Sequence, residues 1–163
     1  MKVKIRQADT RDQDIFIDFS VKLSQFNRSN HNDENKMDNY DAVVEAIRKK
    51  AKATCSNVNE DTLILIAESD GIPVGYALAR IFEEDATADN GTGRVGLIDE
   101  IFVEDSARGL GLGRRLLEET IIWLKDRKIN RIKLHAYSWN AGARKLYERY
   151  GFREYAVAYE LFV

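Results

Sequence analysis

Apolar positions recur along the chain with two different periods, and these periods predict its secondary structure. Alternation with a period of two, which is typical of strands, occurs over residues 3–7. Spacings of four, four and three, which place side chains on one helical face, connect Ile15, Phe19, Leu23 and Phe26. The chain is therefore expected to begin with a strand that is followed by a helix.

The same periods continue to the end of the sequence. Further strands are expected at residues 63–68, 74–82, 95–103, 132–137 and 152–162. Further helices are expected at residues 40–53, 112–128 and 141–150, with polar loops or turns at 26–39 and 83–93. Asp70-Gly71 is a hairpin signal, and Gly151 stands where a glycine ends a helix. The order βααβββαβαβ predicts an α/β layer fold with mixed strand pairing.

Length and charge limit the class of protein. At about 150 residues per domain, the 163 residues predict a single domain spanning 1–163. The 25 Lys and Arg against 27 Asp and Glu give a net charge of −2, without the basic excess of a nucleic-acid binder. No apolar run approaches the ~20 residues that span a bilayer, and the polar N-terminus does not resemble a secretory signal. We therefore expect neither a nucleic-acid partner nor a membrane partner.

Cysteine and histidine are scarce. Cys55 is the one cysteine, which excludes an internal disulfide and favours a reducing, cytoplasmic setting. One thiol with His31 and His135 cannot form a Cys/His zinc site, so we expect no metal. Without a partnered base, Cys55 is expected to be a bystander rather than an acyl carrier.

The most informative segment is a glycine-rich turn, Arg108-Gly109-Leu110-Gly111-Leu112-Gly113, between a predicted strand and a predicted helix. Such a turn leaves backbone N–H groups aimed at one point, and glycine lets a phosphate approach them without a Cβ in the way. The helix dipole adds roughly 0.3–1 kcal/mol of attraction for an anion. We interpret the turn as a pyrophosphate cradle; the alternative is a glycine-rich turn that binds nothing.

The two common nucleotide signatures do not fit this turn. A P-loop needs Gly-Lys-Ser/Thr, but Arg114 and Arg115 follow Gly113. A dinucleotide fingerprint that starts at Gly109 would need glycine where Arg114 stands. The phosphate-bearing ligand must therefore belong to another class.

Two motifs resemble those of the GNAT acetyltransferases. Arg108-x-x-Gly111-x-Gly113, after a strand that ends in Ile-Phe-Val, resembles the acetyl-CoA signature of that family. The run from Asn140 to Phe152 (NAGARKLYERYGF) resembles the later Asn…Leu-Tyr…Gly-Phe motif. The resemblance is strong over residues 95–152. It implies a mostly antiparallel central sheet flanked by helices, with acetyl-CoA as the acetyl donor.

The resemblance also implies how the donor is held. Strand backbone would bond the pantetheine arm as an added strand would, and the amides of the turn would hold the pyrophosphate. The residues implied are Ile101, Phe102, Val103, Arg108, Gly109, Leu110, Gly111, Leu112, Gly113, Arg114, Asn140 and Ala143. For the remaining phosphate, the motif does not choose among Arg114, Arg115, Arg144 and Lys145.

Transfer to an amine needs a base, because an alkyl ammonium with a pKa of about 10.4 must lose a proton. Asp99 and Glu100 lie immediately before the donor-binding strand residues. Adjacent strand residues point to opposite faces, but a bulge, which this strand has in the family, would admit both. The segment LIDEIFV is similar to that of polyamine and diamine acetyltransferases, which carry two acids here. Either acid is a candidate base; the alternative is that one pairs with a cation elsewhere.

The leaving thiolate, whose conjugate acid has a pKa of about 8.5, needs a proton donor. The resemblance makes Tyr147 the general acid, and helical spacing puts it on the same face as Asn140. The alternative is that Tyr147 is a packed core aromatic. Tyr150, one turn further, is a weaker candidate. A backbone N–H near Val103 would meet the developing oxyanion.

These observations predict an acetyl-CoA-dependent N-acetyltransferase in which a primary amine attacks directly in a ternary complex. Acidic residues in the loops near 33–38 and 83–89 favour a small cationic acceptor, polyamine- or diamine-like. An amino acid, aminoglycoside or protein amine would use the same chemistry. An acyl-CoA-sensing module without turnover is the alternative class, and it would need neither Tyr147 nor the two acids. The apolar terminal strand can pair with a copy of itself, which favours a homodimer.

Overall fold

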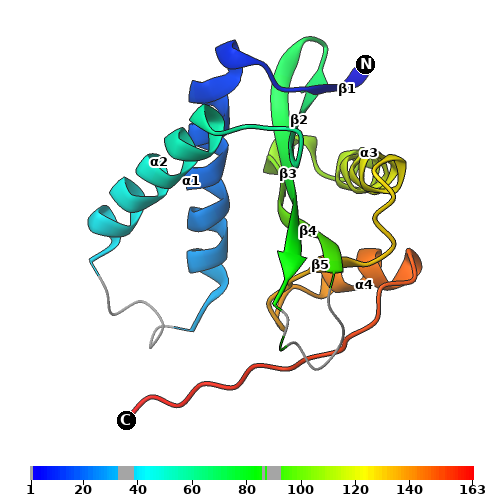
Figure 1. The fold of residues 1–163 in the computed structure, drawn as a ribbon. Helices are drawn as coiled ribbons and strands as arrows, with labels where there is room; N and C mark the ends of the chain where they lie inside the picture. Colours follow the sequence, from blue (N-terminus) through cyan, green and yellow to red (C-terminus); the bar gives the residue numbers. More distant parts are fainter. Residues whose placement is uncertain (1, 33–38, 86, 88–92) are drawn as a thin grey trace.

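Five strands form one sheet at the centre of the molecule (Figure 1). The computed structural model describes residues 2–32, 39–85, 87 and 93–163. The strands lie in chain order as β1 (Val3–Gln7), β2 (Thr62–Ser69), β3 (Ile72–Glu84), β4 (Gly93–Val103) and β5 (Ile132–Leu134). The helices are α1 (Gln13–Asn30), α2 (Tyr40–Ser56), α3 (Leu112–Asp126) and α4 (Ala141–Arg149), with short 3-10 turns at Thr10–Asp12 and Asp105–Ala107.

The pairing in the sheet is mixed. The first four strands pair antiparallel, whereas β4 and β5 pair in parallel over residues 96–98 and 132–134. Asp70 and Gly71 both adopt a positive φ and join β2 to β3, as the Asp-Gly signal predicts. The prediction of a mostly antiparallel α/β sheet flanked by helices is confirmed.

The helices cover both faces of the sheet (Figure 1). Phe16 of α1 and Ala51 of α2 pack against one face. Leu116 and Leu117 of α3 pack against the other, and Leu146 brings α4 to the same side. Because strand side chains alternate between these two apolar layers, β2 is a nearly continuous apolar run. No helix in the described part of the chain is both long and apolar enough to cross a bilayer.

The first helix is longer than predicted. The loop expected at 26–39 begins inside α1, which continues to Asn30. Phe26 accounts for the extension, because its ring lies against Trp139, with centroids 5.8 Å apart, and beneath the guanidinium of Arg108 at 4.5 Å. This tertiary packing outweighs the weak helix propensity of the Asn and Ser residues around it.

The terminal strand expected at residues 152–162 does not form. After Gly151, whose positive φ follows α4 as predicted, the chain is extended but pairs with none of the described strands. Its apolar side chains are exposed; Tyr159 and Leu161 keep 94% and 84% of their surface. Figure 1 shows this segment, in red, leaving the body of the fold. Alternation makes a segment compatible with a sheet, but it does not determine whether the segment pairs with a strand.

Candidate active site

A bulge in β4 brings two acidic side chains to the same face of the sheet. In the ladder between β3 and β4, Glu100 has a partner across from it, but Asp99 does not, because the register shifts there. Ile98 and Ile101, on either side of the two acids, both pack into the core beneath α3. Asp99 and Glu100 therefore lie on the opposite face, the one covered by α1 and α2. The bulge that the family resemblance implies is present.

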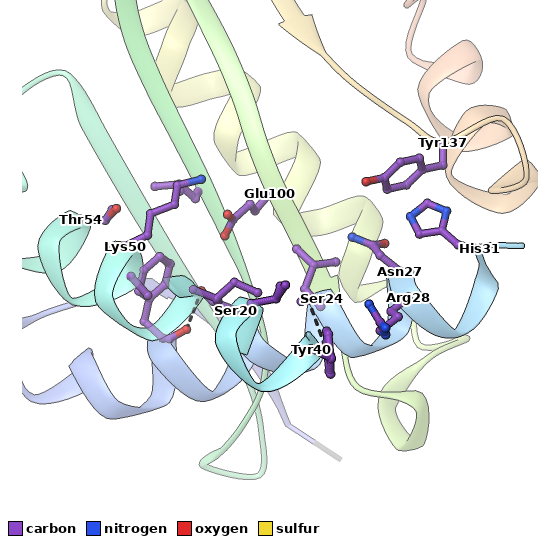
Figure 2. Close-up of a pocket in the computed structure, with 16 residues that line it drawn as sticks. Ser20, Ser24, Asn27, Arg28, His31, Tyr40, Lys50, Thr54, Glu100 and Tyr137 are labelled. Carbon is purple, nitrogen blue, oxygen red and sulfur yellow. Dashed lines mark hydrogen bonds between the residues drawn. The ribbon is translucent and has the colours of Figure 1, made fainter. Parts of the chain in front are cut away.

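Glu100 lies in the wall of a cavity of about 390 Å³ between the sheet and the two N-terminal helices (Figure 2). Tyr76 on β3 donates a hydrogen bond from its hydroxyl to Glu100 Oε2 at 2.7 Å. Burial raises the pKa of the Glu100 carboxyl above its ordinary value, and the hydrogen bond from Tyr76 and the charge of Lys50 offset part of this rise. A carboxylate in such surroundings is suited to accept a proton.

Asp99 has different surroundings from Glu100. It is exposed, and its Oδ2 lies 3.5 Å from Nε of Arg80. The same guanidinium donates a hydrogen bond of 3.2 Å to Thr54 Oγ1 on α2. Among the described residues that line the cavity, Glu100 is present and Asp99 is not. The two neighbouring acids thus have different partners: Glu100 accepts a hydrogen bond from a tyrosine hydroxyl, and Asp99 pairs with a guanidinium.

Another part of the cavity wall is aromatic. His31, Tyr137 and Trp139, which we call the aromatic corner, pack with ring centroids 4.4 Å apart for His31 and Tyr137 and 5.5 Å for Tyr137 and Trp139. Trp139 Nε1 donates to His31 Nδ1 at 3.3 Å. His31 and Tyr137 line the cavity, and Figure 2 shows the Tyr137 hydroxyl turned into it. Lys50 and Arg28 add positive charge to the same wall.

His31, Tyr76, Lys50 and Tyr137 were not predicted as site residues from the sequence. These residues come from α1, β3, α2 and the segment after β5, so no local spacing connects them. Tyr76 alone carries a signal, since a tyrosine inside an apolar strand must find a partner for its hydroxyl.

β4 and β5 separate after three paired positions. The last pair joins Ile98 to Leu134, and the bulge at Asp99 follows at once. The bulge therefore explains why β5 ends at Leu134 instead of residue 137. From Glu100 to Val103, β4 pairs with β3 on one side, and within the described ranges no strand pairs with its other edge. This open edge, which includes residues 101–103, can receive an extended ligand chain.

The glycine-rich turn follows the open edge of β4. Gly109 and Gly111 have φ of +80° and +74°, which glycine adopts without strain. Gly111 is the N-cap of α3 and makes no side-chain cap, while Leu112 is buried and Leu110 is exposed. The backbone N–H groups of residues 109–114 have no acceptor in the described part of the molecule. Such a group of donors at a helix N-terminus fits a pyrophosphate.

Two arginines flank this turn. Arg108 donates from Nε to the carbonyl oxygen of Val103 at 3.2 Å and pairs with Asp105 at 2.8 Å. It therefore braces the turn against the end of β4. Arg114 is more exposed, with Glu118 at 3.9 Å, so its guanidinium remains accessible to solvent.

The second predicted motif lies on α4. Asn140 caps the helix, with its Oδ1 accepting a hydrogen bond of 3.1 Å from the N–H of Ala143. Tyr147, two turns later, packs against Phe152 at 6.0 Å between ring centroids and against the core beneath α3. Burial raises the pKa of the Tyr147 hydroxyl. The hydroxyl is therefore protonated at neutral pH.

Tyr147 and Glu100 lie in the walls of different cavities. Tyr147 lines a smaller cavity of about 190 Å³, together with β5 and residues 152–156. Glu100 is on the face that α1 and α2 cover, whereas Tyr147 is on the side of α3. Tyr150 is exposed, donates a hydrogen bond to Glu118 and lines neither cavity.

The acidic residues expected near the acceptor are only partly within the described residues. Asp33, Glu34, Asp38 and Asp89 lie outside them. Glu84 pairs with Lys133, and Asp85 accepts hydrogen bonds from the backbone and side chain of Thr87. These two carboxylates therefore have local partners. The described residues contain no group of three or more His, Cys, Asp or Glu placed to hold a metal ion.

Comparison with known proteins gives the class. Residues 24–152, which are most of the chain, match the model of the Acetyltransferase (GNAT) family, so the chain belongs to this family. The family resemblance stated from the sequence is confirmed.

Relatives and solved structures agree with this assignment. Spermine/spermidine N(1)-acetyltransferase of Bacillus subtilis (strain 168) is 38% identical over 85 residues, which cover 52% of this chain and 55% of that protein. Mycothiol acetyltransferase of Acidothermus cellulolyticus is 34% identical over 96 residues, 55% of this chain and 29% of that protein. The chain therefore matches only part of each relative's length. A protein of Clostridium acetobutylicum described as a predicted acetyltransferase, solved with acetyl-CoA, shares the fold, with a TM-score of 0.73 and 22% identity over 99% of this chain and 96% of that one.

Proposed function

We propose that the protein is an N-acetyltransferase that moves the acetyl group of acetyl-CoA to a primary amine, which attacks the thioester directly in a ternary complex. The observation that carries this proposal is the position of the Glu100 carboxylate. It lines a cavity, and it lies on the part of β4 that pairs with β3 but no longer with β5. A family member that only senses acyl-CoA would need no base at this position.

Acetyl-CoA would lie along the open edge of β4 and end on the glycine-rich turn. Backbone groups of residues 101–103 would bond the pantetheine arm, and the amides of residues 109–114 would hold the pyrophosphate. The left-handed Gly111 supports this placement, because it aims the first amides of α3 at one point. Asn140 and Ala143, at the start of α4, would border the arm, as the family motif implies.

Glu100 is proposed as the base in preference to Asp99. An ammonium acceptor, with a pKa of about 10.4, has to lose a proton before its nitrogen can attack. The proton passes to the Glu100 carboxylate, directly or through water, and the nitrogen lone pair then attacks the thioester carbonyl carbon. Asp99 forms an ion pair with Arg80 and does not line the cavity.

Tyr147 is proposed as the acid. As the carbon–sulfur bond breaks, the CoA thiolate takes a proton from the Tyr147 hydroxyl, which burial keeps protonated. The attacking nitrogen gives up its second proton as the amide forms, and this proton returns Tyr147 to its hydroxyl form through solvent. A thioester bound along the β4 edge would lie between the two faces of the sheet. A base on one face and an acid on the other would then reach it from opposite sides, which agrees with their separate cavities.

A small polyamine- or diamine-like acceptor is our first proposal for the substrate. It is supported by the 38% identity to spermine/spermidine N(1)-acetyltransferase of B. subtilis and by the carboxylate in the cavity. One observation favours a second candidate, an amine that also carries an anionic group. Lys50 lines the same cavity and forms no ion pair with another residue in the part of the chain that the structure describes.

The test is release of free CoA thiol from acetyl-CoA in the presence of an amine panel: spermidine, putrescine, amino acids and an aminoglycoside. We expect release with at least one amine and its loss in Glu100→Gln. Binding of acetyl-CoA without release for any amine would support the acyl-CoA-sensing module instead.

We further propose a cytoplasmic protein that forms a homodimer. The single Cys55, half-buried in the structure, supports a reducing compartment. The exposed apolar side chains of residues 155–163 support pairing with a second copy. Light scattering of the purified protein tests the dimer, and a monomer at all concentrations would contradict it.

A further inference from the structure

Tyr76 is fully buried in the middle of β3, where other aromatic rings surround it. Phe16 meets its ring edge-on at 5.3 Å, Phe19 stacks on it at 5.9 Å, and Phe102 lies at 6.4 Å, measured between centroids. A phenylalanine at this position would make the same ring contacts. Packing therefore does not account for the hydroxyl, which has to be explained by its hydrogen bond.

The Tyr76 hydroxyl donates to Glu100 Oε2 at 2.7 Å. This bond fixes one oxygen of the carboxylate and leaves the other for a ligand in the cavity. Burial, followed by the nearby charge of Glu100, raises the pKa of Tyr76 well above its ordinary value. Tyr76 therefore keeps its proton and is a hydrogen-bond donor at neutral pH.

The charges of Asp99 on β4, Arg80 on β3 and Lys50 on α2 also act on Glu100. Other charged or titratable groups line the same cavity: Tyr40 on α2, Arg28 on α1, His31 after α1 and Tyr137 after β5. Within the described residues, none of these groups is hydrogen-bonded to the Glu100 carboxylate, and Tyr76 is. Tyr76 thus has the most direct control over the position and charge of this side chain.

We propose that Tyr76 is a positioning residue for the reaction: its hydroxyl orients the Glu100 carboxylate toward the acceptor amine and stabilises its ionised form. This inference rests on the proposed role of Glu100 as the base. Removing the hydroxyl takes a hydrogen bond away from the charged form, so the pKa of Glu100 rises and a larger fraction is protonated at a given acidic pH. The acid limb of the rate profile then moves to higher pH, because only the ionised carboxylate accepts a proton.

The test uses Tyr76→Phe, which keeps the ring. Two quantities are measured: kcat/KM as a function of pH, and the titration of the Glu100 carboxyl carbon by NMR in protein labelled with ¹³C-glutamate. The Glu100 signal is assigned by its absence in Glu100→Gln. We expect the acid limb and the carboxyl titration to move up together by about one pH unit. The plateau value of kcat should fall severalfold because the carboxylate is less well oriented.

Tyr150→Phe is the matched control, because it removes another tyrosine–glutamate hydrogen bond, to Glu118, outside both cavities. It should leave both titrations unchanged. A Tyr76→Phe protein that melts earlier but keeps the wild-type acid limb and carboxyl titration would overturn the positioning role. A shifted carboxyl titration in an enzyme that acetylates no amine would overturn the proposed function while supporting the coupling of Tyr76 to Glu100.

Discussion

The two sides of the candidate active site are built from different parts of the polypeptide. On the donor side, the glycine-rich turn and the open edge of β4 offer backbone groups, from one continuous stretch that ends at residue 114. On the acceptor side, the cavity around Glu100 is made of side chains from α1, α2, two strands and the segment after β5. The donor side therefore depends on backbone conformation, and the acceptor side depends on the identity of individual side chains.

This difference determines which changes each side tolerates. Side chains next to the turn can vary without moving its amides, provided that the positive-φ positions remain glycine. A single substitution in the cavity wall alters its charge or shape directly. Substitutions at the two sides should consequently separate binding of acetyl-CoA from turnover of the amine, and four variants test this separation.

Glu100→Gln should have the largest effect. Removing a general base lowers kcat by ~10²–10⁴-fold, whereas the Kd of acetyl-CoA should stay unchanged because the proposed donor contacts are backbone groups away from Glu100. Steady-state kinetics and calorimetry with acetyl-CoA measure the two quantities. Asp99→Asn is the matched control and should change kcat only severalfold, since Asp99 is paired with Arg80. Equal losses in both variants would contradict the assignment of the base to Glu100.

Tyr147→Phe should slow turnover by about 10–100-fold, with little change in acetyl-CoA binding. In the wild type, burial raises the pKa of Tyr147 above its ordinary value, so the activity that depends on its proton persists until the pH rises through that raised pKa. The phenylalanine variant should lack this alkaline limb. Rates measured across the pH range test whether Tyr147 is the general acid. A variant with the wild-type pH profile would exclude Tyr147 from this role.

Gly111→Ala should weaken acetyl-CoA binding about tenfold, because a left-handed alanine costs roughly 1–2 kcal/mol and the turn relaxes away from the geometry that aims its amides. Gly71→Ala is the matched control: Gly71 has a similar φ of +82°, and an added Cβ would meet nothing within 4 Å at either glycine, but Gly71 lies in the β2–β3 hairpin. Chemical denaturation should show a similar loss of stability in both variants. Calorimetry should show weaker acetyl-CoA binding in Gly111→Ala alone, and equal affinities would refute the phosphate cradle.

The contrast between the two sides also explains how much the sequence could predict. The turn, the bulge region and the α4 motif are local patterns, and the strands and helices up to α4 follow apolar periods that the structure confirms with small changes at their ends. Tyr76 and Lys50 become neighbours of Glu100 only through strand register and helix packing, which no spacing in the sequence encodes. The prediction of a terminal strand at residues 152–162 was wrong for a related reason. The alternation of apolar residues is a local property, whereas pairing depends on a strand elsewhere in the chain.

Lys50→Gln should have the smallest effect and the one that depends most on the acceptor. For a polyamine-like acceptor, removing a positive charge from the cavity wall relieves repulsion, so KM should fall about two- to fivefold. For an amine that carries an anionic group, the same change removes attraction, so KM should rise by a similar factor. Raising the ionic strength should reduce either effect, because Lys50 is exposed to solvent.

Lys52→Gln, which neutralises an exposed lysine of the same helix outside the cavity wall, controls for net charge. Equal KM shifts in the two variants would show that overall charge, and not this wall, selects the acceptor.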